Sequence, residues 1–369
     1  MTETLSRYAL NRALLARQHL LERSAMTPTE MVEHLLGLQA QMPRPPYVGL
    51  WCRVEGIRPQ HLAGLLERGE VVRMVLMRST VHLVSTPDAA FLRPLVAPVL
   101  ERPLRAGSPW ARDLAGCDLE EIAGAADRLL AEGPQPLTEL GAKLGLRWPG
   151  RNPDALAQVA RGFLPLVQLP PRAVWGAAGW SGRPVLQTLD RWPGVPPSRE
   201  ATLDELVCRY LGAFGPASVQ DVQTWSGLRG LRAVVEGLRA ELVTFQDEAG
   251  RELFDLPGAP RPDPSTPAPV RLIPAFDNLL LSHAERTRVI SDHHRRALQT
   301  NSAALKGTFL VDGFVAGQWD LLSRAGGAEV VLEPLVPLTQ VDREHLEDEA
   351  HRLLEFAAAP DQATAVAWR

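Results

Sequence analysis

An internal repeat constrains the fold of this chain more than any single motif does. Gly133-Pro134 and Gly215-Pro216 lie 82 residues apart, and so do Gly145-Leu146 and Gly227-Leu228. Apolar residues with helical spacing precede each Gly-Pro, and the two copies of this pattern are 81 residues apart. Similar residues follow each Gly-Leu, and these two copies are 75 residues apart. Each copy is therefore predicted to form a helix, a Gly-Pro turn, a short helix, a turn, a third helix and a β segment.

The β segments predict hairpins, because short β-rich runs are separated by a few turn residues. In the first copy the runs are Leu166–Leu169, Ala173–Trp175 and Pro184–Leu186; in the second they are Leu242–Phe245 and Leu253–Leu256. Three helices followed by a hairpin are typical of a winged helix, whose third helix usually enters the major groove of DNA. Two small helical layers with no role in nucleic-acid binding remain the alternative.

The N-terminal third is predicted to be a third unit of this kind, enlarged and diverged. Residues Thr27 to Glu30 form a capping box with proline at the first helical position. We expect that helix to run into Gln39-Ala40-Gln41 and to stop before Pro43. It is followed by a helix and two strands of a hairpin, at Pro59–Leu66, Val71–Leu76 and Thr80–Val84, with the turn around Met77-Arg78-Ser79.

The C-terminal part is predicted to be a separate β-rich domain. It follows a proline-rich linker, Pro257–Pro269. Asp312-Gly313 between two alternating runs predicts a hairpin with a type I′ turn. Strands at Val270–Ile273 and Glu329–Leu335 and a closing helix at Arg343–Ala358 complete it. The predicted fold is α+β, with winged helices at residues 1–115, 116–198 and 199–257, and the linker and C-terminal domain at 258–369.

Composition and charge limit the class of protein. Three widely spaced cysteines suggest a reducing compartment and no zinc site. The sequence has neither a signal peptide nor an apolar run long enough to span a bilayer, so we expect a cytoplasmic protein that does not bind membranes. The net charge is −4, yet residues 1–115 have a surplus of basic residues. Phosphate binding needs a local basic groove and not a basic protein.

Two groups of polar residues are candidates for a site. Arg78, Thr80 and His82 alternate on a predicted strand, so they share one face, which either lines a groove or is simply solvated. Gln39 and Gln41 lie where a helix meets a proline-rich turn, and in extended backbone their amides would point the same way. By contrast, His293 and His294, with His283 ten residues earlier, could be metal ligands, but a solvated helix face from His293 to Arg296 is the preferred interpretation.

The sequence resembles the winged-helix DNA glycosylases of the AlkZ/YcaQ type over essentially its whole length. The resemblance depends on four blocks in order: Leu38–Gln41, Arg78–Val84, Leu272–Leu280 and Val311–Asp320. The YcaQ-like branch carries a Gln-x-Asp motif and the AlkZ-like branch a Gln-x-Gln motif. Gln39 and Gln41 make this chain similar to the AlkZ-like branch, whose members are associated with self-resistance to DNA-alkylating natural products, including azinomycin-type crosslinkers.

The resemblance implies a monofunctional DNA glycosylase that acts without a cofactor or metal on double-stranded DNA with alkylated purines. Gln39 and Gln41 would position the water, and Arg78, Thr80 and His82 would line the site or contact DNA. An N7-alkylated guanine is already cationic and leaves readily, so the enzyme has mainly to orient water and stabilise an oxocarbenium-like sugar. An amide carbonyl can do both without being a strong base.

Two other classes remain open from the sequence. A non-catalytic winged-helix regulator would bind the same partner, although such proteins usually read their operators as symmetric dimers, whereas we expect this chain to act as a monomer. A winged-helix scaffold for protein–protein contacts is the third interpretation. Bulky or crosslinked adducts would suit an open channel better than a tight pocket, because such lesions cannot easily be flipped out of the duplex.

Overall fold

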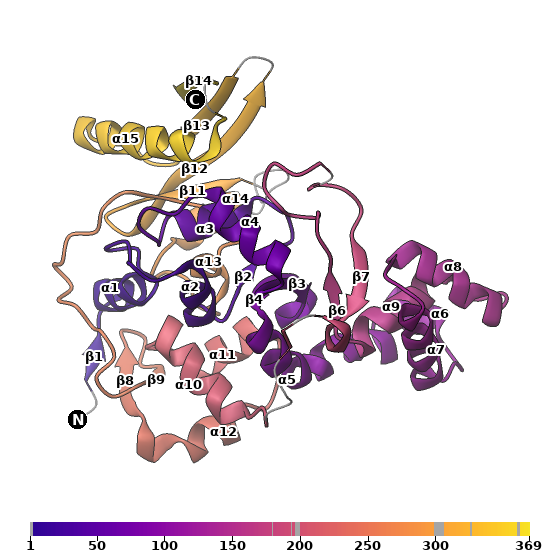
Figure 1. Cartoon of the computed structure of the whole chain (residues 1–369). Coiled ribbons are helices and arrows are strands. Elements are labelled where there is room, and N and C mark those ends of the chain that lie inside the picture. The colour runs from indigo at the N-terminus through magenta and orange to yellow at the C-terminus, as the bar shows by residue number, and fades with distance from the viewer. Residues whose placement is uncertain are drawn as a thin grey trace.

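The structure, a computed structural model, describes residues 3–178, 180–192, 194–195, 200–298, 306–324, 327–359 and 362–369, and shows a mixed α+β fold (Figure 1). Its helices are α1 Arg7–Arg17, α2 Pro28–His34, α3 Pro45–Trp51, α4 Pro59–Arg68, α5 Thr86–Arg105, α6 Pro109–Asp113, α7 Leu119–Ala131, α8 Leu137–Arg147, α9 Pro153–Phe163, α10 Leu203–Phe214, α11 Val219–Ser226, α12 Arg232–Gly237, α13 Asn278–Leu281, α14 Asp292–Leu298 and α15 Gln340–Ala357, with short 3-10 turns at Met77–Ser79, Leu189–Arg191 and Arg239–Glu241. Its strands are β1 Thr4–Leu5, β2 Leu38–Gln39, β3 Val71–Val75, β4 Val81–Ser85, β5 Gln135–Pro136, β6 Leu166–Gln168, β7 Val185–Thr188, β8 Val243–Asp247, β9 Glu252–Asp255, β10 Arg271–Ile273, β11 Gly307–Val311, β12 Phe314–Arg324, β13 Gly327–Pro334 and β14 Ala363–Trp368.

Three segments of the chain share one order of elements. Each has a helix, two further helices and then a hairpin, as the repeat predicted: α2, α3, α4 and β3–β4; α7, α8, α9 and β6–β7; α10, α11, α12 and β8–β9. The structure adds a short extended piece after the first helix of each segment, which the sequence did not reveal. This piece pairs with the second hairpin strand, at Leu38↔Leu83, Gln135↔Leu186 and Ala217↔Phe254.

The first two segments join through one sheet. Strand β3 pairs antiparallel with β6, at Arg73↔Gln168 and Met74↔Val167, which gives the six-stranded order β2-β4-β3-β6-β7-β5. The prediction that Ala173–Trp175 forms a strand of the second segment's hairpin was wrong. These residues lie in a turn, and the strand that pairs with β6 is β7. The predicted boundary at residues 198 and 199 lies outside the described residues, and the division of the chain into domains stays a prediction.

The third segment is tied to the N-terminus. Its hairpin extends to the three-stranded sheet β1-β8-β9, in which β1 runs parallel to β8. A fully buried ion pair, in which Arg17 donates to both carboxylate oxygens of Asp255 at 2.6 and 2.8 Å, joins α1 to β9. Figure 1 shows α10–α12 on one side of the central elements α2 and β2, and the C-terminal sheet on the other.

The C-terminal sheet has the order β10-β11-β12-β13-β14, with α15 against it. The predicted Asp312-Gly313 turn is present, and both residues have the positive φ that a type I′ turn requires (45° and 78°). The closing helix begins earlier than predicted, where Thr339 and Asp342 form a capping box. Strand β14, which pairs parallel with β13, was not predicted.

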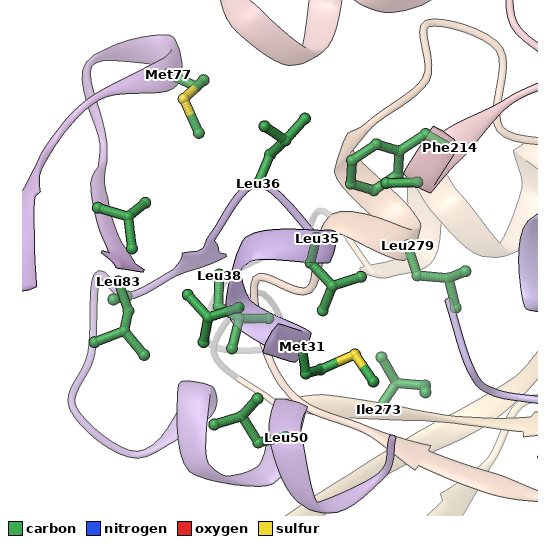
Figure 2. Packing of buried hydrophobic residues seen from close by; sticks show 14 of the residues in the cluster. Met31, Leu35, Leu36, Leu38, Leu50, Met77, Leu83, Phe214, Ile273 and Leu279 are labelled. Atoms are coloured by element: carbon green, nitrogen blue, oxygen red, sulfur yellow. The ribbon is translucent and has the colours of Figure 1, made fainter. Parts of the chain in front are cut away.

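One hydrophobic core unites the first segment, the third segment and the C-terminal sheet. Figure 2 shows side chains from all three meeting around α2 and β2: Met31, Leu35, Leu36 and Leu38, with Phe214 from α10, Ile273 from β10 and Leu279 from α13. The second segment has a separate core, built from α7, α8 and α9 with Leu104 of α5. The strand that carries Gln39 therefore lies where three parts of the chain pack together.

Candidate active site

Gln39 and Gln41 lie on extended backbone and not at the end of a helix. Helix α2 stops at His34, and positive φ angles at Leu36 (53°) and Gly37 (93°) turn the chain into β2. The amide of Ala40 then donates to the carbonyl of Val81 at 2.7 Å, which continues the pairing with β4. The prediction that the helix runs into the Gln-x-Gln motif was therefore wrong, and the extended alternative describes the motif.

Arg78 holds the side chain of Gln39. Gln39 is 8% exposed, and its Oε1 accepts a 2.8 Å hydrogen bond from Nη2 of Arg78. The same guanidinium group donates to the carbonyl of Trp225 on α11 and, at 3.2 Å, to Oδ1 of Asn278. Arg78 has no carboxylate partner among the described residues; burial, and after it the nearby Arg286, lowers its pKa to about 10. Arg78 therefore stays charged at neutral pH. Its hydrogen bonds join Gln39 to Trp225 of the third segment and to Asn278 of the C-terminal part.

Gln41 differs from Gln39 because its side chain is exposed. Its Oε1 accepts a 3.3 Å hydrogen bond from the backbone amide of Val81. The side chain thus supplies a contact to β4 beyond the end of the backbone pairing. A carbonyl oxygen has two lone pairs, and in both glutamines one remains after these contacts. The motif thus presents one fixed amide and one solvent-facing amide.

His82 faces Gln39 across the paired strands β2 and β4. It is fully buried, and its Nδ1 lies 3.0 Å from the carbonyl of Thr80. Since a carbonyl accepts, Nδ1 must donate, which leaves Nε2 as an unprotonated nitrogen with no partner among the described residues. Burial, reinforced by Arg78, lowers the pKa of His82 to about 3, so the ring is neutral at physiological pH.

The predicted common face of Arg78, Thr80 and His82 is only partly present. Arg78 lies in a 3-10 turn with positive φ (55°) and not on the strand, yet its side chain and His82 both lie next to Gln39. The hydroxyl of Thr80 instead donates to the carbonyl of Met77 at 3.1 Å, which closes the turn. Thr80 therefore has a structural contact, and the roles predicted for the three residues stay predictions.

Two further residues support the motif, and sequence reasoning missed both. Arg73 on β3 is buried and donates to the carbonyl of Ala40 at 2.6 Å, between the two glutamines, while its Nε and Nη1 have no partner among the described residues. Burial, with Arg172 as the next cause, lowers its pKa to about 10. Asn278 donates to the carbonyl of Gly37 at 3.3 Å and accepts from Arg78. A charged residue in the apolar run Val71–Val75 was the signal that could have revealed Arg73.

The loop that leads into α13, whose first residue is Asn278, is anchored by a buried ion pair. Arg53 donates to both oxygens of Asp277 at 2.9 and 2.8 Å, and both side chains are 1% exposed. The carboxylate outweighs the effect of burial and raises the pKa of Arg53. A buried bidentate pair of this kind fixes geometry, because losing one partner would leave an uncompensated charge. Asn278 is thereby held next to Arg78.

The described residues contain no group of three or more His, Cys, Asp and Glu side chains that could hold a metal ion. His283 is buried and bonds to the carbonyl of Phe214 at 3.0 Å, whereas His293 is exposed on α14. None of the described helices is both long and apolar enough to cross a membrane.

Comparisons with known proteins identify the fold and the family. The solved structure of Streptomyces sahachiroi DNA glycosylase AlkZ matches 98% of this chain and 100% of its own, with a TM-score of 0.78 and 18% sequence identity. A likeness at this identity shows the fold. The model of a family described as "DNA glycosylase AlkZ-like" matches residues 32–356, so the chain belongs to the AlkZ-like DNA glycosylase family. The resemblance predicted from the sequence is confirmed.

A curated relative adds a narrower match. The "Interstrand DNA cross-link repair glycosylase" of Streptomyces sahachiroi is 28% identical over 167 residues. The aligned part is 42% of this chain and 43% of that protein, so this match spans less than half of the relative's length.

Proposed function

We propose that this protein is a DNA glycosylase that hydrolyses the N-glycosidic bond of cationic N7-alkylated purines. The observation that carries the proposal is the Gln39-x-Gln41 motif on an extended strand, with Gln39 fixed by Arg78 and Asn278 beside it, in a chain that belongs to the AlkZ-like family. The element order of the three segments supports their interpretation as winged-helix units, with the C-terminal β-rich domain appended.

The residues account for a reaction that needs little acid catalysis. The electron pair of the C1′–N9 bond leaves with the alkylated base and neutralises its positive charge. Water bonds to C1′ and loses its proton to solvent. Gln39 and Gln41 hold that water through their free carbonyl lone pairs, and the contact of Gln39 with Arg78 pre-orients it. Because His82 is neutral, it adds no further positive charge next to a cationic lesion.

This chemistry confines the enzyme to labile lesions. An amide is a weaker base than a carboxylate, so an intact neutral base, which is a poor leaving group, would remain attached. The name of the Streptomyces sahachiroi relative supports extending the substrates to bulky or crosslinked adducts, such as those of a natural-product alkylating agent. Self-resistance or base-excision repair would be the setting for that activity.

The test is excision from a defined duplex. The protein is incubated with DNA that carries one N7-methylguanine, and abasic sites are then cleaved with alkali and resolved on a gel. We expect cleavage at the lesion and none in the undamaged duplex. Failure to release N7-methylguanine and a bulky N7 adduct, together with tight binding to one undamaged sequence, would instead support a winged-helix regulator.

A further inference from the structure

A cavity of about 230 Å³ lies beside the loop that leads into α13, just before Asn278. Its wall includes Phe276 and Asp277 of that loop, and the cations Arg286, Arg295 and Lys306. Pockets that enclose drug-sized ligands usually measure roughly 300–1,000 Å³, so this one suits a smaller group. Most of the other lining residues are apolar, so three cations against the single carboxylate of Asp277 favour an anion.

The charges around the cavity are unequally compensated. Lys306 pairs with Glu333 at 2.6 Å and Arg295 with Asp292 at 2.9 Å, while Asp277 is engaged by Arg53. Arg286 is different. Its Nε donates to the carbonyl of His283 at 3.1 Å, but within the described ranges no carboxylate lies at salt-bridge distance from it. A half-buried guanidinium group therefore faces the cavity, and no described residue supplies its counter-charge.

Arg286 also lies among other cations. Burial, and after it Arg295, lowers the pKa of Arg286, and Arg286 in turn is the second cause of the lowered pKa of Arg78. Repulsion thus links Arg295 to Arg286 and Arg286 to Arg78, the residue that holds Gln39. Like charges at such proximity destabilise the empty site, and a bound anion would relieve that cost.

The same loop borders a second, smaller hollow on the side of the catalytic motif. Pro274 and Ala275 line both cavities, and the second is also lined by Met42 and Arg44, which follow Gln41 in the chain. Arg44 donates to the carbonyl of Leu321 at 3.0 Å. Basic residues therefore occur on both sides of Pro274-Ala275, and one of the two hollows lies next to the segment that follows Gln41.

We propose that the cavity at Arg286 is a phosphate subsite, which takes a backbone phosphate of the DNA strand that carries the lesion. The proposal rests on the proposed function and deepens it. Arg286 supplies a two-pronged contact that suits phosphate oxygens, and Arg295 and Lys306 flank it. A phosphate held there fixes the sugar next to it relative to Gln39, so the subsite positions the anomeric carbon and does not select the base.

The test is DNA binding by Arg286→Gln, compared with Arg352→Gln. Arg352 is 63% exposed on the acidic helix α15 and serves as the matched loss of one charge. Affinity for an undamaged duplex is measured by fluorescence anisotropy over a series of KCl concentrations. We expect Arg286→Gln to weaken binding roughly 10-fold and to reduce the slope of log affinity against log salt by about 0.9, the value for one phosphate contact. The control should change neither.

A second arm identifies the phosphate. Single phosphates next to an N7-methylguanine are replaced in turn by a neutral methylphosphonate. One replacement should weaken binding of the wild-type protein and have no further effect on Arg286→Gln, as coupling in a double-mutant cycle requires. Arg295→Gln, on the exposed helix α14, should show a weaker coupling to the same phosphate. This variant provides the test if Arg286→Gln folds poorly.

The outcomes separate this inference from the proposed function. Two results would overturn the subsite, whatever the enzyme excises. One is an unchanged salt slope in Arg286→Gln. The other is that, at every position, the loss of affinity from the methylphosphonate simply adds to the loss from Arg286→Gln. Competition by inorganic phosphate that depends on Arg286, with duplex binding unaffected by Arg286→Gln, would overturn the assignment to DNA. A reduced salt slope for Arg286→Gln, in a protein that releases neither N7-methylguanine nor a bulky N7 adduct, would keep the subsite and refute the proposed N7-purine substrate.

Discussion

Arg78 donates a 2.8 Å hydrogen bond to the side-chain oxygen of Gln39, so an arginine in the turn between β3 and β4 fixes a glutamine on the neighbouring strand β2. The same guanidinium group reaches Trp225 and Asn278, which belong to distant parts of the sequence. The orientation of the Gln39 amide therefore depends on the packing of three segments against one another.

Replacing Arg78 should impair catalysis more than binding. In Arg78→Ala the Gln39 amide loses its partner and becomes free to rotate, and a small misplacement of a positioning group can cost about 100-fold in rate. We expect a loss of that order in single-turnover excision of N7-methylguanine, with Arg352→Ala unaffected. Equal losses of rate and of DNA affinity would show that Arg78 is mainly a phosphate contact.

Gly37 should be intolerant of any side chain. Its φ is +93°, and a Cβ there would lie 2.5 Å from Cγ1 of Val84 and 2.8 Å from the carbonyl oxygen of Leu83. Gly37→Ala should lower the free energy of unfolding by roughly 1–2 kcal/mol for the backbone conformation and by about 1–3 kcal/mol more for overpacking. Gly56→Ala is the control, because Gly56 also has positive φ (+62°) but has nothing within 4 Å. Similar losses for the two variants in urea unfolding would contradict the predicted clash at Gly37.

Buried His82 should make stability depend on pH. Its pKa is about 3 in the folded protein, below the ordinary value of 6.5, so the unfolded chain binds a proton that the folded protein excludes. The contribution is fully present above pH 6.5 and is lost as the pH falls toward 3. His82→Gln should therefore reduce the acid sensitivity of the free energy of unfolding between pH 6.5 and 5, by up to about 1.4 kcal/mol per pH unit. The variant should still lose some stability as the pH falls, because the pKa of His283 is also about 3. Parallel curves for wild type and variant would refute the neutral, buried His82.

The sequence predicted local structure well where one short pattern determines it. The Asp312-Gly313 hairpin and the capped start of α2 are examples, because turn and cap residues act within a few positions. The end of α2 was mispredicted because Gly37 was overlooked: a glycine with positive φ just after a helix is a common stop signal, and Leu36 before it also has positive φ. The pairing of β3 with β6 likewise depends on contacts about 95 residues apart.

The candidate site was predicted in part. Gln39 and Gln41 were candidates from their position in the chain, and their role came from the resemblance to a family; the structure shows that one is fixed and the other exposed. Asn278 lay within a matching block, yet its contact with Arg78 spans 200 residues and could not be deduced from spacing. Thr80 was selected by strand alternation, which fails once the chain enters a turn.

The hairpin β8–β9 should not be the main phosphate clamp. Its tip carries two acids and one arginine, and Arg251 is paired with Asp247 at 2.6 Å and with Glu285 at 3.5 Å. Asp247 also accepts from the backbone of Ala249 and of Arg251, so it stabilises the turn. We expect Arg251→Gln to leave the salt dependence of duplex binding unchanged, in contrast to Arg286→Gln. A fall in slope of about 0.9 would assign a phosphate to this tip.

Parallel measurement of excision and binding for Gln39→Ala and Gln41→Ala tests the central claim most directly. Single-turnover release of N7-methylguanine should fall at least about 100-fold in each variant, as for loss of one pre-oriented catalytic group. The dissociation constant for the same duplex should stay nearly unchanged, because the amides hold water and do not neutralise phosphates. Gln41→Asp should retain some activity on small cationic lesions. Rate and affinity that fall together, or excision that survives both alanine variants, would show that the two glutamines do not position the water.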